Sequence, residues 1–278
     1  EQVDPEVDPT EAVDAAEDAD VAVVVVQDAA TEDFDRPLAL PGNQDELVSQ
    51  VADTAERTVV VMKTGGPVEM PWADEVDAIV EAWYPGQEDG RAIASVLFGD
   101  TDPSGRLPIT FGASAGDYPT DSQRQHPGID LEAEYSEGVF VGYRHFDETD
   151  TEPLYPFGHG LSYADFEYGD VAVDHDGASA TVEVTVENVS DRDGREVVQA
   201  YLGADDPSVE RPPKELAAFE SVELAAGEER TVALSLSERD FAYYDEDAAD
   251  WVVDPGDYTV TVGRSSRNAV DSETITVE

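Results

Sequence analysis

Cysteine is absent from the 278 residues of the chain, so disulfides, a thiol nucleophile and thiolate metal ligands are excluded. The four histidines are scattered along the chain and do not indicate a zinc site. No apolar run approaches the ~20 residues that a membrane-spanning helix needs, and the longest, residues 21–26, has the length of a strand. We therefore expect no metal, no cofactor and no membrane segment.

Basic residues are also few. The chain has 65 Asp and Glu against 15 Lys and Arg, of which only Lys63 and Lys214 are lysines, and its net charge is −50. Such a charge repels nucleic acid and anionic membranes, so neither is expected as a partner. It also destabilises a compact fold unless salt screens it, and at molar salt the Debye length falls to ~3 Å. Because the acids are spread over the whole chain, the composition indicates a protein from a halophile.

The acidity does not place the chain in either of two further classes of acidic protein. An acidic disordered protein does not fit the strong strand patterning, and a cation store does not fit because no EF-hand spacing is present. Residues 1–20 are acidic and show neither the basic start nor the apolar core of a signal peptide. There is no initiator methionine, so the natural start is expected to lie elsewhere, and a cytoplasmic or a secreted location in a high-salt environment stays open.

The first part of the chain alternates between strand and helix patterns. "DVAVVVV" at 20–26 and "TVVVM" at 58–62 are short β-branched runs of the kind buried on both faces of a parallel sheet. Residues 43–58 have helical apolar spacing with Asn43 at the N-cap position, 76–86 carry a third strand, 88–99 a helix and 105–111 a fourth strand. This order predicts an α/β domain with a parallel sheet.

The later part changes to period two. Residues 112–160 have little periodicity, and after Tyr163 alternating runs such as "SATVEVTVENVS" are separated by turn signals such as "DPGD". Long irregular segments in compact domains are usually functional. Short alternating strands at this spacing predict an antiparallel β-sandwich of the immunoglobulin or fibronectin type. The expected fold class is thus α/β plus all-β, with an α/β domain at 1–163 and a β-sandwich at 164–278.

A group of carboxylates follows the first predicted strand. Glu32, Asp33 and Asp35 come shortly after that strand, with Arg36 beside them. Ligands of parallel sheets bind at the carboxyl ends of strands, and a shielded carboxyl there can act as a general acid. In so acidic a protein, however, any loop is rich in carboxylates, and the pattern alone favours an ordinary solvated loop.

The order of motifs resembles glycoside hydrolase family 3, in particular its β-glucosidase and β-xylosidase members. The resemblance runs from about Val13 to Gly263 and is most specific in "AWYPGQEDGRAIASVLFGDTDPSGRLPITF" and "YPFGHGLSYADFEY". It implies a C-terminal α/β domain, truncated at its start, and a fibronectin type III-like domain. The family's general acid/base Glu lies three residues before the Asp of an Asp-Arg pair, which corresponds here to Glu32 before Asp35 and Arg36. Asp33 stands where the family pattern usually has Gly.

The resemblance also implies what is missing. Members of the family carry a (β/α)8 barrel that supplies a nucleophilic Asp, and no such stretch occurs in this chain. We therefore expect a hydrolase part that supplies only the acid/base for β-linked glycosides or oligosaccharides. It would be inactive until a barrel, in the same or a companion chain, completes it. The alternative is a non-catalytic carbohydrate-binding or structural module left after loss of the barrel.

Three further residues are candidates for substrate binding or loop shaping. Tyr143 and Arg144 lie in "YSEGVFVGYRHFDE", as a wall of the sugar site or as a support that pins a loop to the domain. His159 lies between two glycines in "FGHGLSY", facing the site or forming a hinge. "TGGPVEM" at 64–70 lacks the spacing of a nucleotide-binding loop and is interpreted as a turn between elements.

Overall fold

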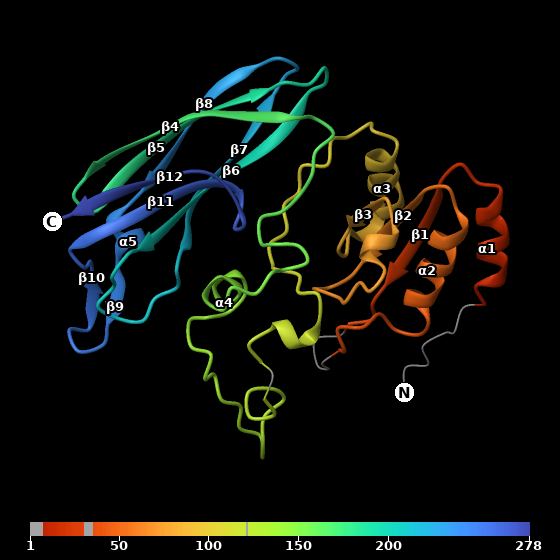
Figure 1. Ribbon diagram of the computed structural model, residues 1–278, viewed down its shortest axis with the longest axis horizontal. Coiled ribbons are helices and arrows are strands. Elements are labelled where there is room, and N and C mark those ends of the chain that lie inside the picture. Colours follow the sequence, from red (N-terminus) through yellow and green to blue (C-terminus); the bar gives the residue numbers. More distant parts are fainter. Residues whose placement is uncertain (1–7, 31–35, 121) are drawn as a thin grey trace. The chain divides into compact units, whose positions relative to one another are not determined.

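The computed structural model describes residues 8–30, 36–120 and 122–278 (Figure 1). The chain divides into two compact units, one of Glu1–Phe98 with Phe111–Ala115 and the other of Gly99–Thr110 with Gly116–Glu278. Among the described residues, no helix combines the length and the apolar character needed to cross a bilayer. The predicted fold class, α/β plus all-β, is confirmed, whereas the predicted domain border at residue 163 stays a prediction.

The first unit is built on a parallel sheet with the strand order β1-β2-β3. Its strands are β1 (Ala22–Gln27), β2 (Thr58–Lys63) and β3 (Ala78–Glu81). Its helices and 3₁₀ turns are α1 (Thr10–Glu17), α2 (Gln44–Thr54), η1 (Ala73–Glu75), η2 (Gly86–Glu88) and α3 (Asp89–Leu97). Helix α2 begins directly after Asn43, as predicted. Because both strand pairs are parallel, the three strands end at the same edge of the sheet.

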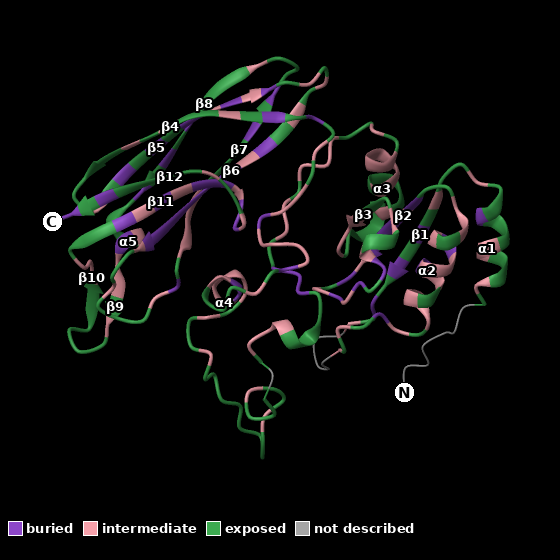
Figure 2. Ribbon diagram, in the orientation of Figure 1, coloured by how far each residue is buried: buried purple, intermediate pink, exposed green. Residues whose placement is uncertain are grey.

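The two faces of β1 differ in burial (Figure 2). Val24 and Val26 are buried on the face that α2 covers, where Val48 and Val51 complete the core. Val23 and Val25 on the other face are 48% and 56% exposed. The prediction that this strand is buried on both faces was therefore wrong for β1. On the second face the described chain covers β2, where Val61, the in-register partner of Val25, is fully buried, but it leaves β1 half exposed.

The second unit is a β-sandwich with three- and four-stranded antiparallel sheets and a small two-stranded one. The larger sheets have the orders β12-β11-β6-β7 and β4-β5-β8. The strands are β4 (Phe166–Asp176), β5 (Ser179–Asn188), β6 (Gly194–Ala204), β7 (Glu215–Leu224), β8 (Glu229–Leu236), β9 (Tyr243–Asp245), β10 (Asp250–Val252), β11 (Gly256–Ser265) and β12 (Asn268–Val277). The remaining elements are η3 (Ala115–Asp117), α4 (Tyr143–Glu148) and α5 (Glu238–Phe241).

The period-two pattern accounts for the core of the sandwich. In β5, Val182, Val184 and Val186 are fully buried and alternate with exposed or half-buried polar residues. Strands β8 and β11 alternate in the same way, so the inner faces of the two sheets close over one apolar core. The predicted β-sandwich is confirmed.

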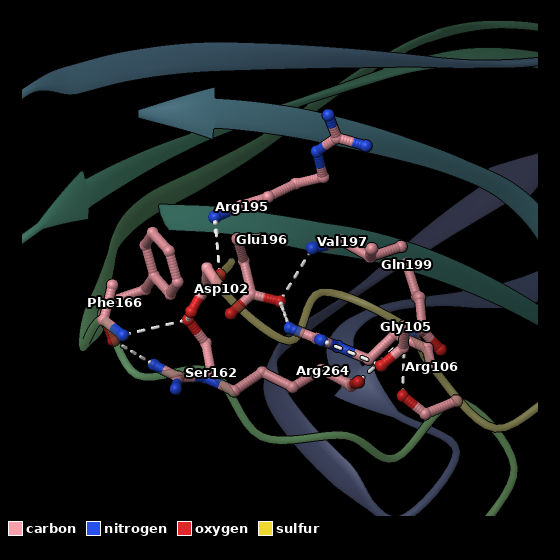
Figure 3. A network of polar contacts seen from close by, with 12 residues as sticks. Asp102, Gly105, Arg106, Ser162, Phe166, Arg195, Glu196, Val197, Gln199 and Arg264 are labelled. Carbon is pink, nitrogen blue, oxygen red and sulfur yellow. Dashed lines mark hydrogen bonds and ion pairs between the residues drawn. The ribbon is translucent and has the colours of Figure 1, made fainter. Parts of the chain in front are cut away.

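Strand β6 departs from this alternation and is buried along most of its length. Polar segments cover its other face within the same unit (Figure 3). Arg106 donates to Glu196 at 2.8 Å, with both side chains less than a tenth exposed. Gln199 donates to the carbonyls of Gly158 and Arg264 at 3.1 and 2.7 Å. A strand buried on both faces thus satisfies its polar side chains through irregular segments that precede the sandwich and through the neighbouring strand β11.

One predicted strand is not formed. Residues 105–111 hold two backbone bonds, from Leu107 N to His159 O and from Gly158 N to Leu107 O, both at 2.8 Å, but no strand is built there. Pro108 has no backbone N–H to donate and is disfavoured in the interior of a sheet, which is consistent with the absence of a strand here. The prediction of a fourth strand was wrong.

Candidate acid/base loop at the sheet edge

Asp28 follows β1 directly and is the centre of a polar cluster at the carboxyl edge of the first unit's sheet. It is 9% exposed. Its carboxylate accepts a hydrogen bond from Gly65 N at 3.1 Å and another from the hydroxyl of Tyr84. The third contact is an ion pair with Arg36, with 3.1 Å between Oδ2 and Nε. Asp28 therefore joins the ends of all three strands: its own, the turn after β2 and the turn after β3.

Arg36 is held from several sides. Besides the ion pair, Nη2 donates to the carbonyl of Pro67 at 3.0 Å and Nη1 to that of Pro37 at 3.4 Å. A Cβ on Gly66 would lie 2.8 Å from Nη2, so the backbone approaches the guanidinium as closely as glycine alone permits. These contacts hold the Arg36 side chain in place, and its predicted role in shaping the loop stays a prediction.

Glu32, Asp33 and Asp35, the predicted acid/base and its two acidic neighbours, lie outside the described residues. The structure describes the residues on either side of this segment. In sequence, Glu32 stands between Asp28 and Arg36, and these two side chains are bonded to each other. The two flanks of the predicted catalytic segment are therefore tied together at the sheet edge.

The glycine pair of "TGGP" has a structural purpose in this cluster. A Cβ on Gly65 would lie 2.9 Å from the Tyr84 hydroxyl and 3.0 Å from its ring. Its absence lets Tyr84 and the Gly65 N–H reach the same carboxylate. The interpretation of "TGGPVEM" as a turn between elements agrees with its place directly after β2.

Glu81 ends β3 beside this cluster. Its Oε1 accepts from Trp83 N at 2.7 Å, and its Oε2 lies 2.9 Å from Thr64 Oγ1. Burial raises the pKa of Glu81 to about 7, and the negative charge of Asp28 acts in the same direction. Trp83 has φ of 53°, a left-handed conformation that non-glycine residues adopt at some cost. The turn after β3 is thus held by a hydrogen bond to a carboxyl group whose pKa is raised.

Sequence reasoning missed Asp28, Thr64, Glu81 and Tyr84. A signal was present, because each of them lies at or just after the end of a predicted parallel strand. Thr64 and Tyr84 carry no charge, however, and one more acid in so acidic a chain does not stand out.

Tyr143, Arg144 and His159 belong to the second unit. The hydroxyl of Tyr143 accepts from Leu216 N at 2.8 Å, and Arg144 pairs with Glu215 at 2.8 Å, so both connect α4 to β7. His159 stacks on Tyr155 with ring centroids 5.4 Å apart. Burial, with the positive charge of Arg106, lowers the pKa of His159. These contacts give all three residues supporting partners, and a role toward substrate stays a prediction.

Comparison with known proteins decides the family. Residues 2–163 match the glycosyl hydrolase family 3 C-terminal domain, and residues 196–266 match the fibronectin type III-like domain. The chain belongs to glycosyl hydrolase family 3. The order of these two matches agrees with the order of the α/β and all-β parts of the fold.

The relatives of this family 3 chain include several β-glucosidases. It is 46% identical over 275 residues to thermostable beta-glucosidase B of Acetivibrio thermocellus, covering 96% of this chain and 36% of the relative. An exo-alpha-(1->6)-L-arabinopyranosidase of Bifidobacterium breve is 42% identical, with coverage of 100% and 37%. Family membership thus spans more than one sugar specificity.

Solved structures agree with the fold of the family 3 chain. The β-glucosidase DesR of Streptomyces venezuelae, in complex with D-glucose, matches with a TM-score of 0.94 and 40% identity over 97% of this chain and 35% of its own. A family 3 β-glucosidase of Bifidobacterium adolescentis also matches with a TM-score of 0.94, at 41% identity over 99% and 42%. The chain spans about a third of the length of the curated relatives it matches.

Proposed function

We propose that this chain is the acid/base-bearing part of a retaining glycoside hydrolase that acts on β-glucosides or β-xylosides. Glu32 is its general acid/base, and Asp33 and Asp35 shape the segment around it. The observation that supports this most is the pairing of Asp28 with Arg36, which ties both flanks of Glu32 to the edge of a parallel sheet in a family 3 chain.

Retaining hydrolysis needs a second carboxylate about 5–5.5 Å from the acid/base. We propose that a (β/α)8 barrel, in the same or a companion chain, supplies this nucleophilic Asp. The chain's coverage of about a third of its relatives, several of them β-glucosidases, supports this division of labour.

The proposed reaction has two steps. The barrel carboxylate attacks the anomeric carbon while Glu32 protonates the departing glycosidic oxygen. Glu32, now ionised, then takes a proton from the water that cleaves the glycosyl-enzyme. The group must therefore be reproducibly placed in both steps. The ion pair between Asp28 and Arg36, which fixes described residues on either side of Glu32, is consistent with this requirement.

The test uses the protein joined to, or mixed with, its barrel in molar KCl. Glu32→Gln should lower kcat/KM on an alkyl β-glucoside by about 10²–10⁴-fold. The loss should be smaller on an aryl glucoside with a good leaving group, because that oxygen needs less protonation. Glu56→Gln, a change at an exposed glutamate after α2, serves as the matched control and should leave both rates unchanged. Full activity of the Glu32 variant on both substrates would reject the assignment.

A further inference from the structure

The hydroxyl of Thr64 faces two oxygens but has one proton. Thr64 Oγ1 lies 2.9 Å from the carbonyl oxygen of Gly66 and 2.9 Å from Oε2 of Glu81, and Thr64 is fully buried. A hydroxyl donates one hydrogen bond and accepts up to two. If Glu81 were ionised, one of these two contacts would be a pair of oxygens with no hydrogen between them, inside the protein.

Protonation of Glu81 removes this conflict. Oε2–H then donates to Thr64 Oγ1, and Thr64 O–H donates to the carbonyl of Gly66, so that every short contact is a hydrogen bond. The other oxygen of Glu81 still accepts from Trp83 N at 2.7 Å. Only the neutral form of the Glu81 carboxyl therefore supplies a hydrogen for each of these buried oxygen–oxygen contacts.

We propose that Glu81 is a positioning residue for Asp28 and Arg36, the two residues that flank the predicted acid/base. It acts in its protonated form, as the hydrogen-bond donor to Thr64 Oγ1. The consequence for catalysis rests on the proposed function. The hydrogen-bonded chain ends on the turn whose Gly65 N–H bonds Asp28 and whose Gly66 lies against the Arg36 guanidinium. A proton on Glu81 therefore stabilises the turn that holds both flanks of the loop.

The charged groups around Glu81 influence its protonation equilibrium. Asp28 opposes its ionisation directly. The other charged or titratable groups of the described cluster are Arg36, which pairs with Asp28, Lys63, which pairs with Asp89 at 2.6 Å, and Tyr84. The two cations are thus neutralised by other carboxylates. The N–H groups of Trp83 and Thr64 favour the ionised form, as does the Thr64 hydroxyl whenever it donates to Glu81. Burial outweighs these contacts and raises the pKa of Glu81 to about 7.

The pH dependence follows from the sign of this shift. The pKa in the folded state lies above the ordinary value of 4.5, so the stability contributed by the proton is fully present below pH 4.5. It is lost as the pH rises to about 7. We expect the turn, and with it its contacts with Asp28 and Arg36, to loosen above neutral pH.

The chain by itself suffices for the first test. Carboxyl carbons of ¹³C-labelled glutamate are titrated by NMR in molar KCl, and the resonance missing in Glu81→Gln is assigned to Glu81. We expect its midpoint near pH 7. Thr64→Val, which is close to isosteric, discriminates the direction of the hydrogen bond. If Thr64 accepts from neutral Glu81, the midpoint falls in this variant, and an unchanged or raised midpoint would overturn the proposal.

The second test uses the chain completed with its barrel. Glu81→Gln imitates the protonated carboxyl, so kcat/KM should be kept below neutral pH while the basic limb of its pH profile moves to higher pH. A merely structural role would lower activity at all pH values without moving the limb, and would overturn the positioning role. The two proposals fail separately, because full activity of Glu32→Gln rejects the proposed function while leaving the titration of Glu81 in the chain alone intact.

Discussion

Asp28 and Arg36 form an ion pair of 3.1 Å between Oδ2 and Nε, and this contact draws together two positions between which the predicted acid/base lies. Both side chains are largely buried, with 3% and 20% exposed, so neither charge is well solvated without the other. The pair thus holds residues 28 and 36 together at the sheet edge of the first unit.

Removing one member of the pair should be costly. Asp28→Ala leaves the guanidinium of Arg36 without its counter-charge and also frees Gly65 N–H and the Tyr84 hydroxyl. We expect a loss of about 3–5 kcal/mol in the stability of the first unit, measured by hydrogen exchange of the amides of β1 and β2. The control is Glu88→Ala, which breaks an exposed pair with Arg91 and should cost less than ~1 kcal/mol. Equal costs would contradict the role given to Asp28.

The close approach of Gly65 to Tyr84 makes a second prediction. Gly65→Ala puts a methyl group 2.9 Å from the Tyr84 hydroxyl and should destabilise the first unit by about 1–3 kcal/mol through overpacking. Tyr84→Phe removes that oxygen, so in the double variant part of this cost should disappear. The measurement is a double-mutant cycle in denaturant unfolding. If the free-energy losses of Gly65→Ala and Tyr84→Phe were strictly additive, the Tyr84 hydroxyl would not be what excludes a methyl group at residue 65.

The buried Arg106–Glu196 pair should stabilise the second unit in the same manner. Arg106→Met leaves Glu196, which is 3% exposed, without its cation, and we expect a loss of about 3–5 kcal/mol in the unfolding free energy of the sandwich. Arg195→Met is the matched control, because its partner Glu223 is on the surface. Thermal melting monitored by near-ultraviolet circular dichroism compares the two variants. A control that melts as low as Arg106→Met would show that burial of the pair is unimportant.

Salt should strongly stabilise the chain. At a net charge of −50, screening in molar KCl removes most of the self-repulsion among surface carboxylates. We expect the melting temperature to rise by roughly 10 °C or more between 0.1 M and 2 M KCl, recorded by circular dichroism. A melting temperature that does not change over this range would refute the halophilic interpretation.

The sequence predicted those elements whose burial follows a single period. The alternation in β5, β8 and β11 predicted the sandwich, and helix α2 begins where Asn43 indicated. Two predictions failed, one because it depended on what the rest of the chain covers and one because of a proline within the predicted strand. Val23 and Val25 have the residue type of a buried strand, but about half of each stays exposed in the described chain. Pro108 interrupts a stretch that otherwise has the composition of a strand.

The candidate site was predictable only in outline. The position of the acidic segment after β1 and its Arg36 anchor could be read from the order of residues. The cluster that holds this segment could not, because it depends on contacts between turns that are distant in sequence. Tyr84 reaching Asp28, and the shared hydroxyl of Thr64 between Gly66 and Glu81, arise only when three strands end side by side.

The division of the chain has a consequence for engineering. The backbone leaves the first unit at residue 98, returns to it for 111–115 and leaves it again, so no single breakpoint separates the two units. A chimera spliced at one junction after residue 163 would carry residues 99–110 from one parent and their packing surface on β6 from the other. Exchange of the sandwich between homologues should therefore succeed only when the other parts of the second unit, residues 99–110 and 116–163, are exchanged together with it.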